Sequence, residues 1–322
     1  MDMFFQKKRN VVITAVFYTF LWGCAFPLVK LCMEAFQIPD TDNMSKCLVA
    51  GMRFACSGIL TLVWCACKEE TGIKVNLSQM KSILLYGILA TSLQYSFTYI
   101  GLSRIDGSKG AVYDQMCVFV IVLTSGIFFR EDRLNLKKIM GCIMGFAGVL
   151  LINAEGLSFT VAKGVLINTA GMSFSFDILG EGVMLCAVLF QTIAYFVVKS
   201  TAQTIPAPKL VGYGQLLGGI LLCLFSLACG GRIYGVNGTA ILTMGALVLI
   251  SAVAYVLSLM PLKYFPASEI SSFNLLISVF GVVMSSLLLK ENIFRWNYGV
   301  SLLMISVGIL LINARRKFGG KR

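Results

Sequence analysis

The sequence has no histidine and few charged residues. Histidine is the side chain that most readily titrates near neutral pH, and it is a common zinc ligand, so its absence argues against a zinc site. Any proton coupling would then have to use a carboxylate. Charged residues make up only 13% of the 322 residues, and apolar residues make up 57%. In an ordinary soluble domain roughly a quarter of the residues are charged. This composition therefore excludes an ordinary soluble domain.

Catalytic patterns are also missing. The sequence has no HExxH pattern, no acidic cluster with the spacing of a metal site, and no recognisable pairing of nucleophile and base. We therefore expect no enzyme activity, no metal and no cofactor. A membrane-embedded enzyme is left as the remote alternative.

Long apolar runs take the place of these features. Windows of about 20 residues that are poor in charge are long enough to cross a hydrocarbon layer roughly 30 Å thick. They predict about ten membrane-spanning helices, at residues 11–33, 46–67, 80–102, 107–129, 135–153, 182–199, 208–229, 239–262, 267–289 and 294–313.

One part of the chain occurs twice. Residues 125–154 are repeated at 285–314, so that Glu131 matches Glu291, Gly148 matches Gly308, and both copies end in LLINA. With five helices in each copy, the second copy must enter the membrane from the opposite face. We therefore expect an all-α integral membrane protein of two inverted five-helix repeats around a central cavity, an arrangement typical of secondary transporters.

The predicted organisation has four parts. Residues 11–154 form the first repeat, 155–181 an outer connector, 182–314 the second repeat, and 315–322 a basic cytoplasmic tail. The connector is too polar for a span, and we expect a short hairpin through 159–161 and 174–176. Glu131 and Glu291 are expected to close helix corners rather than to bind substrate.

Positive charge is unevenly distributed along the chain. Placing the N-terminus in the cytoplasm puts most Lys and Arg residues, including those of the tail, on the inner side, as the positive-inside rule requires. We therefore expect a multi-pass protein of the cell membrane (plasma or inner membrane) with both termini in the cytoplasm. The net charge of +12 is then explained without a nucleic-acid partner.

Several segments resemble a known family. LWGCAFPLVK at 21–30, GMRFACSG at 51–58, and the segments 107–154 and 271–291 are similar to the drug/metabolite transporter superfamily, in particular to its ten-helix proteins with two EamA-type domains. The resemblance implies an inverted-repeat fold, alternating access and export of small organic metabolites. The family often has proline where this chain has Cys117 and Ile277, so a helix kink there would be absent or produced differently.

Two charged residues fall deep within predicted spans. Charges in the bilayer cost at least a few kcal/mol each, so Arg53 and Asp114 are functional candidates. If their helices are neighbours, the two side chains can form an ion pair. That pair would be either a permanent link between helices or a coupling device in which Asp114 exchanges Arg53 for a substrate amine or a proton. Lys30, at a helix end, is expected to reach the lipid headgroups.

Polar and aromatic side chains within spans are the other candidates for the cavity, because a buried amide needs a hydrogen-bond partner, either another helix or the substrate. Asn274 stands in the second repeat where Asp114 stands in the first. The cavity residues we predict are Trp22, Gln94, Tyr99, Asp114, Gln191, Tyr255 and Asn274, with Tyr95, Gln115, Tyr195 and Gln215 as further candidates.

Together these features predict a secondary transporter that exports a small organic metabolite, an amino acid or a related compound. The alternative within transport is an exchanger of phosphorylated solutes or nucleotide sugars, which would need several cationic side chains in the cavity. The expected partners are a small-molecule substrate, the lipid bilayer and, for an energised cycle, protons. Both a monomer and a homodimer are compatible with the sequence.

Overall fold

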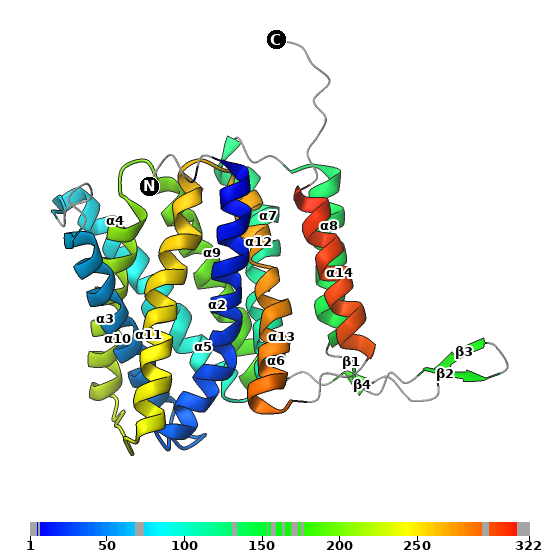
Figure 1. Ribbon diagram of the computed structural model, residues 1–322, viewed down its shortest axis with the longest axis horizontal. Coiled ribbons are helices and arrows are strands. Elements are labelled where there is room, and N and C mark those ends of the chain that lie inside the picture. The colour runs from blue at the N-terminus through cyan, green and yellow to red at the C-terminus, as the bar shows by residue number, and fades with distance from the viewer. Residues whose placement is uncertain are drawn as a thin grey trace, which may run out of the picture.

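The protein is a bundle of long helices (Figure 1). Eight helical segments among the described residues are long and apolar enough to cross a membrane, which confirms the predicted all-α membrane fold. The computed structural model describes residues 5, 7–67, 74–130, 134–152, 154–155, 159–162, 165–168, 173–174, 177–291 and 296–313.

The first half contains five helical segments within the described residues, and two of them are divided. The third is divided by a π-helix, and the fourth is broken near its middle. The elements are α2 (Lys8–Ala35), α3 (Asn43–Cys67), α4 (Leu77–Gly87), η1 (Ile88–Leu93), α5 (Gln94–Leu102), α6 (Gly107–Asp114), α7 (Met116–Phe128) and α8 (Leu136–Ile152).

The second half follows the same order, again with a break in its fourth segment. Its first segment begins with a π-helical turn at Ile178, ahead of the predicted start at residue 182. The elements are η3 (Ile178–Gly182), α9 (Val183–Thr201), α10 (Ala207–Ala228), α11 (Gly238–Leu259), η4 (Met260–Lys263), α12 (Ala267–Phe273), α13 (Leu276–Leu289) and α14 (Trp296–Asn313).

The connector contains short strands, but their pairing differs from our prediction. β2 (Phe159–Ala162) pairs with β3 (Val165–Asn168), and β1 (Ala154–Glu155) pairs with β4 (Ser173–Phe174), both antiparallel. The predicted pairing of 159–161 with 174–176 is therefore wrong, and residues 175–176 lie outside the described part of the chain. Strands that are close in sequence pair at a lower cost in loop entropy, which favours the local partner.

Helices of the two halves pack mainly against each other. α3 lies on α10, α8 on α14, α5 on α9, and α2 on both α11 and α13. Figure 1 shows the start of α2 and the end of α14 at one side of the bundle, and β1 and β4 at the opposite side. The five helical segments of the first half account for this placement, which agrees with inverted repeats.

Glycines allow the close contact between α3 and α10. A side-chain carbon at Gly51 would lie 2.9 Å from the carbonyl oxygen of Gly219, and one at Gly219 would lie 2.8 Å from the carbonyl oxygen of Gly51. Any larger residue would push the helices apart. The contact holds α3 in place, and α3 carries Arg53.

Two lysines make matching contacts in the two halves. Lys30 donates from Nζ to the carbonyl oxygen of Ile105, 2.9 Å away, so the prediction that it reaches the headgroups is wrong. Lys199 donates to the carbonyl oxygens of Leu262 and Phe265, at 3.0 and 2.9 Å. Each lysine donates hydrogen bonds to backbone carbonyl groups just before a broken helix. These groups need a protein donor because little water reaches them inside the bundle.

Glu291 closes the start of α6. Its carboxylate accepts hydrogen bonds from the backbone N–H groups of Gly107 and Ser108, at 2.8 and 3.1 Å. These N–H groups have no partner within the helix, and they carry the positive end of its dipole. Glu291 thus caps a helix of the other half, while the corner expected within its own repeat continues into residues 292–295, outside the described part of the chain, and stays a prediction. Glu131 also lies outside the described residues.

Candidate substrate cavity

The fourth helical segment of each half is broken near its middle. In the first half, Gln115 separates α6 from α7, and its N–H bonds the carbonyl of Val112 at 3.1 Å. In the second half, Asn274 and Leu275 separate α12 from α13, and the N–H of Asn274 bonds the carbonyl of Ser271 at 2.9 Å. These bonds span three residues, so both breaks are tight turns formed without proline. Both helices are therefore interrupted at these positions by a turn, without a proline ring.

The third segment is irregular at the same site. The π-helix η1 ends directly before Gln94, and single π-turns of this kind are frequent at functional sites because they shift the side chains that follow. Gln94, Tyr95, Thr98 and Tyr99 follow it along α5, and all four line one cavity.

That cavity lies between the halves, next to both helix breaks. It opens partly to the outside, and both polar and aromatic side chains line it. Its walls include all seven residues predicted from the sequence, and Arg53 as well: Trp22, Arg53, Gln94, Tyr99, Asp114, Gln191, Tyr255 and Asn274. The structure thus brings every predicted residue together, and their binding of substrate stays a prediction.

Arg53 is buried at the wall, with 1% of its surface exposed. Its Nε donates to Ser251 Oγ at 2.8 Å, and its Nη1 donates to Tyr99 Oη at 3.2 Å. The guanidinium carbon lies 4.8 Å from the Phe54 ring centre and 5.8 Å from that of Tyr95. Its Nη2 has no hydrogen-bond partner among the described residues. The direct ion pair with Asp114 is not formed there, because the bonds of Arg53 go to α11 and α5.

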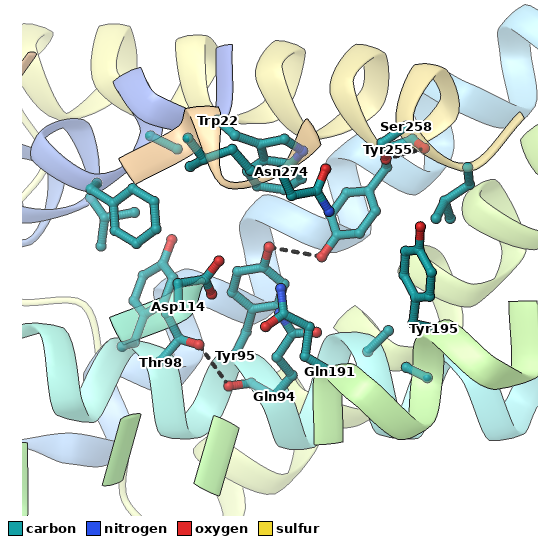
Figure 2. Close-up of a pocket in the computed structure, with 18 of the residues that line it drawn as sticks. Trp22, Gln94, Tyr95, Thr98, Asp114, Gln191, Tyr195, Tyr255, Ser258 and Asn274 are labelled. Carbon is teal, nitrogen blue, oxygen red and sulfur yellow. Dashed lines mark hydrogen bonds between the residues drawn. The ribbon is translucent and has the colours of Figure 1, made fainter. Parts of the chain in front are cut away.

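Asp114 is the last residue of α6 and accepts a hydrogen bond from the Gln115 side chain at 2.9 Å. Figure 2 shows it across one space from Asn274, with Tyr95 and Gln191 nearby. Tyr255 and Tyr95 join their hydroxyls at 2.7 Å, and Trp22 meets Tyr255 edge to face at 4.7 Å between ring centres. Aromatic rings thus form part of the wall near the polar groups.

The further candidates divide into two groups. Tyr95 and Tyr195 line the cavity, whereas Gln115 and Gln215 do not. Gln215 accepts from Ser57 Oγ at 2.7 Å, which links α3 to α10.

Sequence reasoning missed Tyr86, Thr98 and Ser258, which also line the cavity. Thr98 and Ser258 are one helical turn from the predicted residues Gln94 and Tyr255, so helical spacing could have indicated them.

The chain matches the model of the EamA-like transporter family over residues 9–154 and 178–314. An uncharacterized transporter of Bacillus subtilis, YvbV, is 25% identical over 321 residues, which is 97% of this chain and 93% of that protein. An uncharacterized transporter of Haemophilus influenzae is 24% identical over 226 residues, 67% of this chain and 68% of that protein.

A solved crystal structure of a protein also aligns with the chain. The TM-score is 0.66 at 16% identity, and the alignment covers 95% of this chain and 98% of the other. At that identity the likeness shows the fold alone.

Proposed function

The chain belongs to the EamA-like transporter family and is a membrane transporter, and we propose that it exports a small organic metabolite, an amino acid or a related compound, by alternating access. In this proposal it is a secondary transporter of the cell membrane with both termini in the cytoplasm. It acts as a monomer or a homodimer.

One observation carries the proposal. A polar and aromatic cavity lies between the repeats, where α6/α7 and α12/α13 are both broken. Broken helices at the interface of inverted repeats are the usual place for substrate in secondary transporters, because the breaks free backbone groups and act as pivots.

The exchanger of phosphorylated solutes fits these walls less well. A phosphate with two negative charges calls for several cationic groups, and Arg53 is the cationic residue among the described residues that line the cavity. Membership of a transporter family likewise points away from the membrane-embedded enzyme.

Asp114 is the group best placed for coupling. It is the carboxylate among the described lining residues, and its partial burial makes its charge sensitive to what enters the cavity. Exchange of a proton or of a substrate amine at Asp114 would link transport to the membrane potential, where one charge crossing ~100 mV is worth ~2.3 kcal/mol.

A metabolite export screen tests the proposal. Cells that overproduce the chain should release one class of small metabolite faster than cells that overproduce Asp114→Asn at an equal level in the membrane. An uncoupler should reduce the difference if protons drive export. Equal release by both cell lines for every metabolite would contradict the proposal.

A further inference from the structure

The cavity has a cationic end at Arg53, which no carboxylate among the described residues neutralises. In the described part of the chain Arg53 donates to neutral groups, the hydroxyls of Ser251 and Tyr99, and it lies against the rings of Phe54 and Tyr95. Its Nη2 is buried and has no partner among the described residues. A buried guanidinium in this position is costly until it meets an anion. The bidentate partner that suits it best is a carboxylate.

A second end of the cavity has oxygen acceptors instead. Asp114 supplies a carboxylate from α6, and Gln191 and Asn274 come from α9 and from the break after α12. Gln191 Oε1 and Asn274 Oδ1 have no hydrogen-bond partner among the described residues. Three groups from three segments thus offer oxygens around the space that Figure 2 shows. An alkylammonium group has three N–H donors and one positive charge, and it matches this set.

From these two ends we propose that the transported solute is a zwitterion, with its carboxylate bound by Arg53 and its ammonium bound by Asp114, Gln191 and Asn274. This rests on the proposed transport function and specifies both its substrate class and the orientation of the substrate. A plain amine would leave Arg53 without a counter-ion, and a plain carboxylate would leave Asp114 without one.

Aromatic residues line the cavity beside the cationic group. Tyr95 lies beside Arg53, and its hydroxyl is joined to that of Tyr255. Both tyrosines line the same cavity as Arg53 and Asp114, so a solute that contacts both charged groups must carry both charges on one small skeleton. An α-amino acid has that form.

The test uses the full-length protein in liposomes. Each of the twenty common L-amino acids is loaded inside, and counterflow of the same labelled amino acid is measured. For those transported, the carboxamide, which lacks the carboxylate, and the N-acetyl derivative, which lacks the ammonium, are added as competitors. Both derivatives should compete at least about tenfold more weakly than the free amino acid, as the loss of a charge-assisted contact requires.

The variant Arg53→Gln then tests the role of Arg53 separately from that of the acidic end. Binding to this variant is measured by titrating each ligand and recording the melting temperature. The free amino acid and its carboxamide should bind about equally, while the N-acetyl derivative should still bind more weakly. Arg53→Lys should restore part of the preference for the free acid. Arg104→Gln, which removes an exposed cation outside the cavity, is the matched control and should leave the preferences unchanged.

The outcomes distinguish this inference from the function on which it rests. Equal competition by the carboxamide in the wild-type protein overturns the orientation and leaves amino-acid transport intact, and this comparison needs no variant. A preference for the free acid that persists in Arg53→Gln overturns the role of Arg53. Absence of counterflow for all twenty amino acids overturns the substrate class, and the export screen then decides whether another metabolite is carried.

Discussion

The two broken helices of the cavity have the same form and different chemistry. α6 and α12 both end at a tight turn that is followed at once by a longer helix, α7 or α13. The first break places Asp114 in the cavity wall, and the second places Asn274 there. The two side chains are close in size and shape, but only the first carries a charge.

This difference shows how a duplicated scaffold becomes a specific site. Both halves have the backbone breaks, which the proposed alternating access would use at related positions. Charge is costly within the bilayer, and of these two related positions one carries it; in the proposed function this charge selects the solute. We therefore expect substitutions at the two breaks to affect transport unequally.

The largest effect should come from making the two halves alike. Asp114→Asn gives each break an asparagine and removes the carboxylate from the cavity wall. We expect counterflow to fall by about 100-fold, the factor that corresponds to losing one strong charge-assisted contact. Counterflow in liposomes measures it.

The matched control for this variant is Asp42→Asn, which removes a carboxylate away from the cavity. It should keep most of its counterflow. If Asp114→Asn transports as well as the wild type while being inserted at the same level, Asp114 has no part in the mechanism.

A smaller effect should follow from exchanging the two side chains. The double variant Asp114→Asn with Asn274→Asp keeps one carboxylate and moves it to the related position. Because Figure 2 shows both side chains facing one space, we expect it to recover about a tenth of wild-type counterflow. A double variant as inactive as Asp114→Asn alone would show that the two positions are not interchangeable.

The lysines before the broken helices allow a comparison of stability. Lys199 bonds two carbonyl oxygens and Lys30 bonds one. Lys199→Met should therefore lower the free energy of unfolding by about 2 kcal/mol and Lys30→Met by about 1 kcal/mol. Thermal unfolding in detergent measures both, with the exposed Lys81→Met as control. A larger loss for Lys30→Met would contradict the comparison.

The spans and the cavity residues could be predicted because the bilayer core tolerates few unpaired polar groups. Apolar runs of fixed length identify the helices, and amides or charges that survive within them must face a partner or a cavity. Gln191 and Asn274 were found in this way. Thr98 and Ser258 were missed because a hydroxyl can bond its own helix, as Thr98 does with the carbonyl of Gln94 at 2.9 Å, so it carries no such signal.

The packing of the helices determines the partners of Arg53, which the sequence alone could not predict. Arg53 was assigned Asp114 as a possible partner on the basis of depth alone. In the structure the glycine contacts of α3 place it against α10, and Arg53 meets Ser251 of α11 and Tyr99 of α5 instead. A partner across helices depends on which faces meet, and a pattern along one chain does not determine that.

The smallest expected effect concerns the contact that joins the second half to the broken helix of the first. Glu291 accepts from Gly107 and Ser108 at the start of α6, whose last residue is Asp114. Glu291→Gln keeps an acceptor but loses the negative charge that the helix start favours, so the free energy of unfolding should fall by about 0.5 kcal/mol. Thermal unfolding measures this, and Glu34→Gln, an exposed carboxylate on α2, should have no effect. The hydrogen bonds of Glu291 hold the start of α6 against the end of α13, so their loss should also shift Asp114 at the other end of α6. The apparent affinity for substrate should then fall slightly, while the maximal rate of transport is kept. A variant with wild-type melting temperature would show that the carboxylate contributes geometry without net stabilisation.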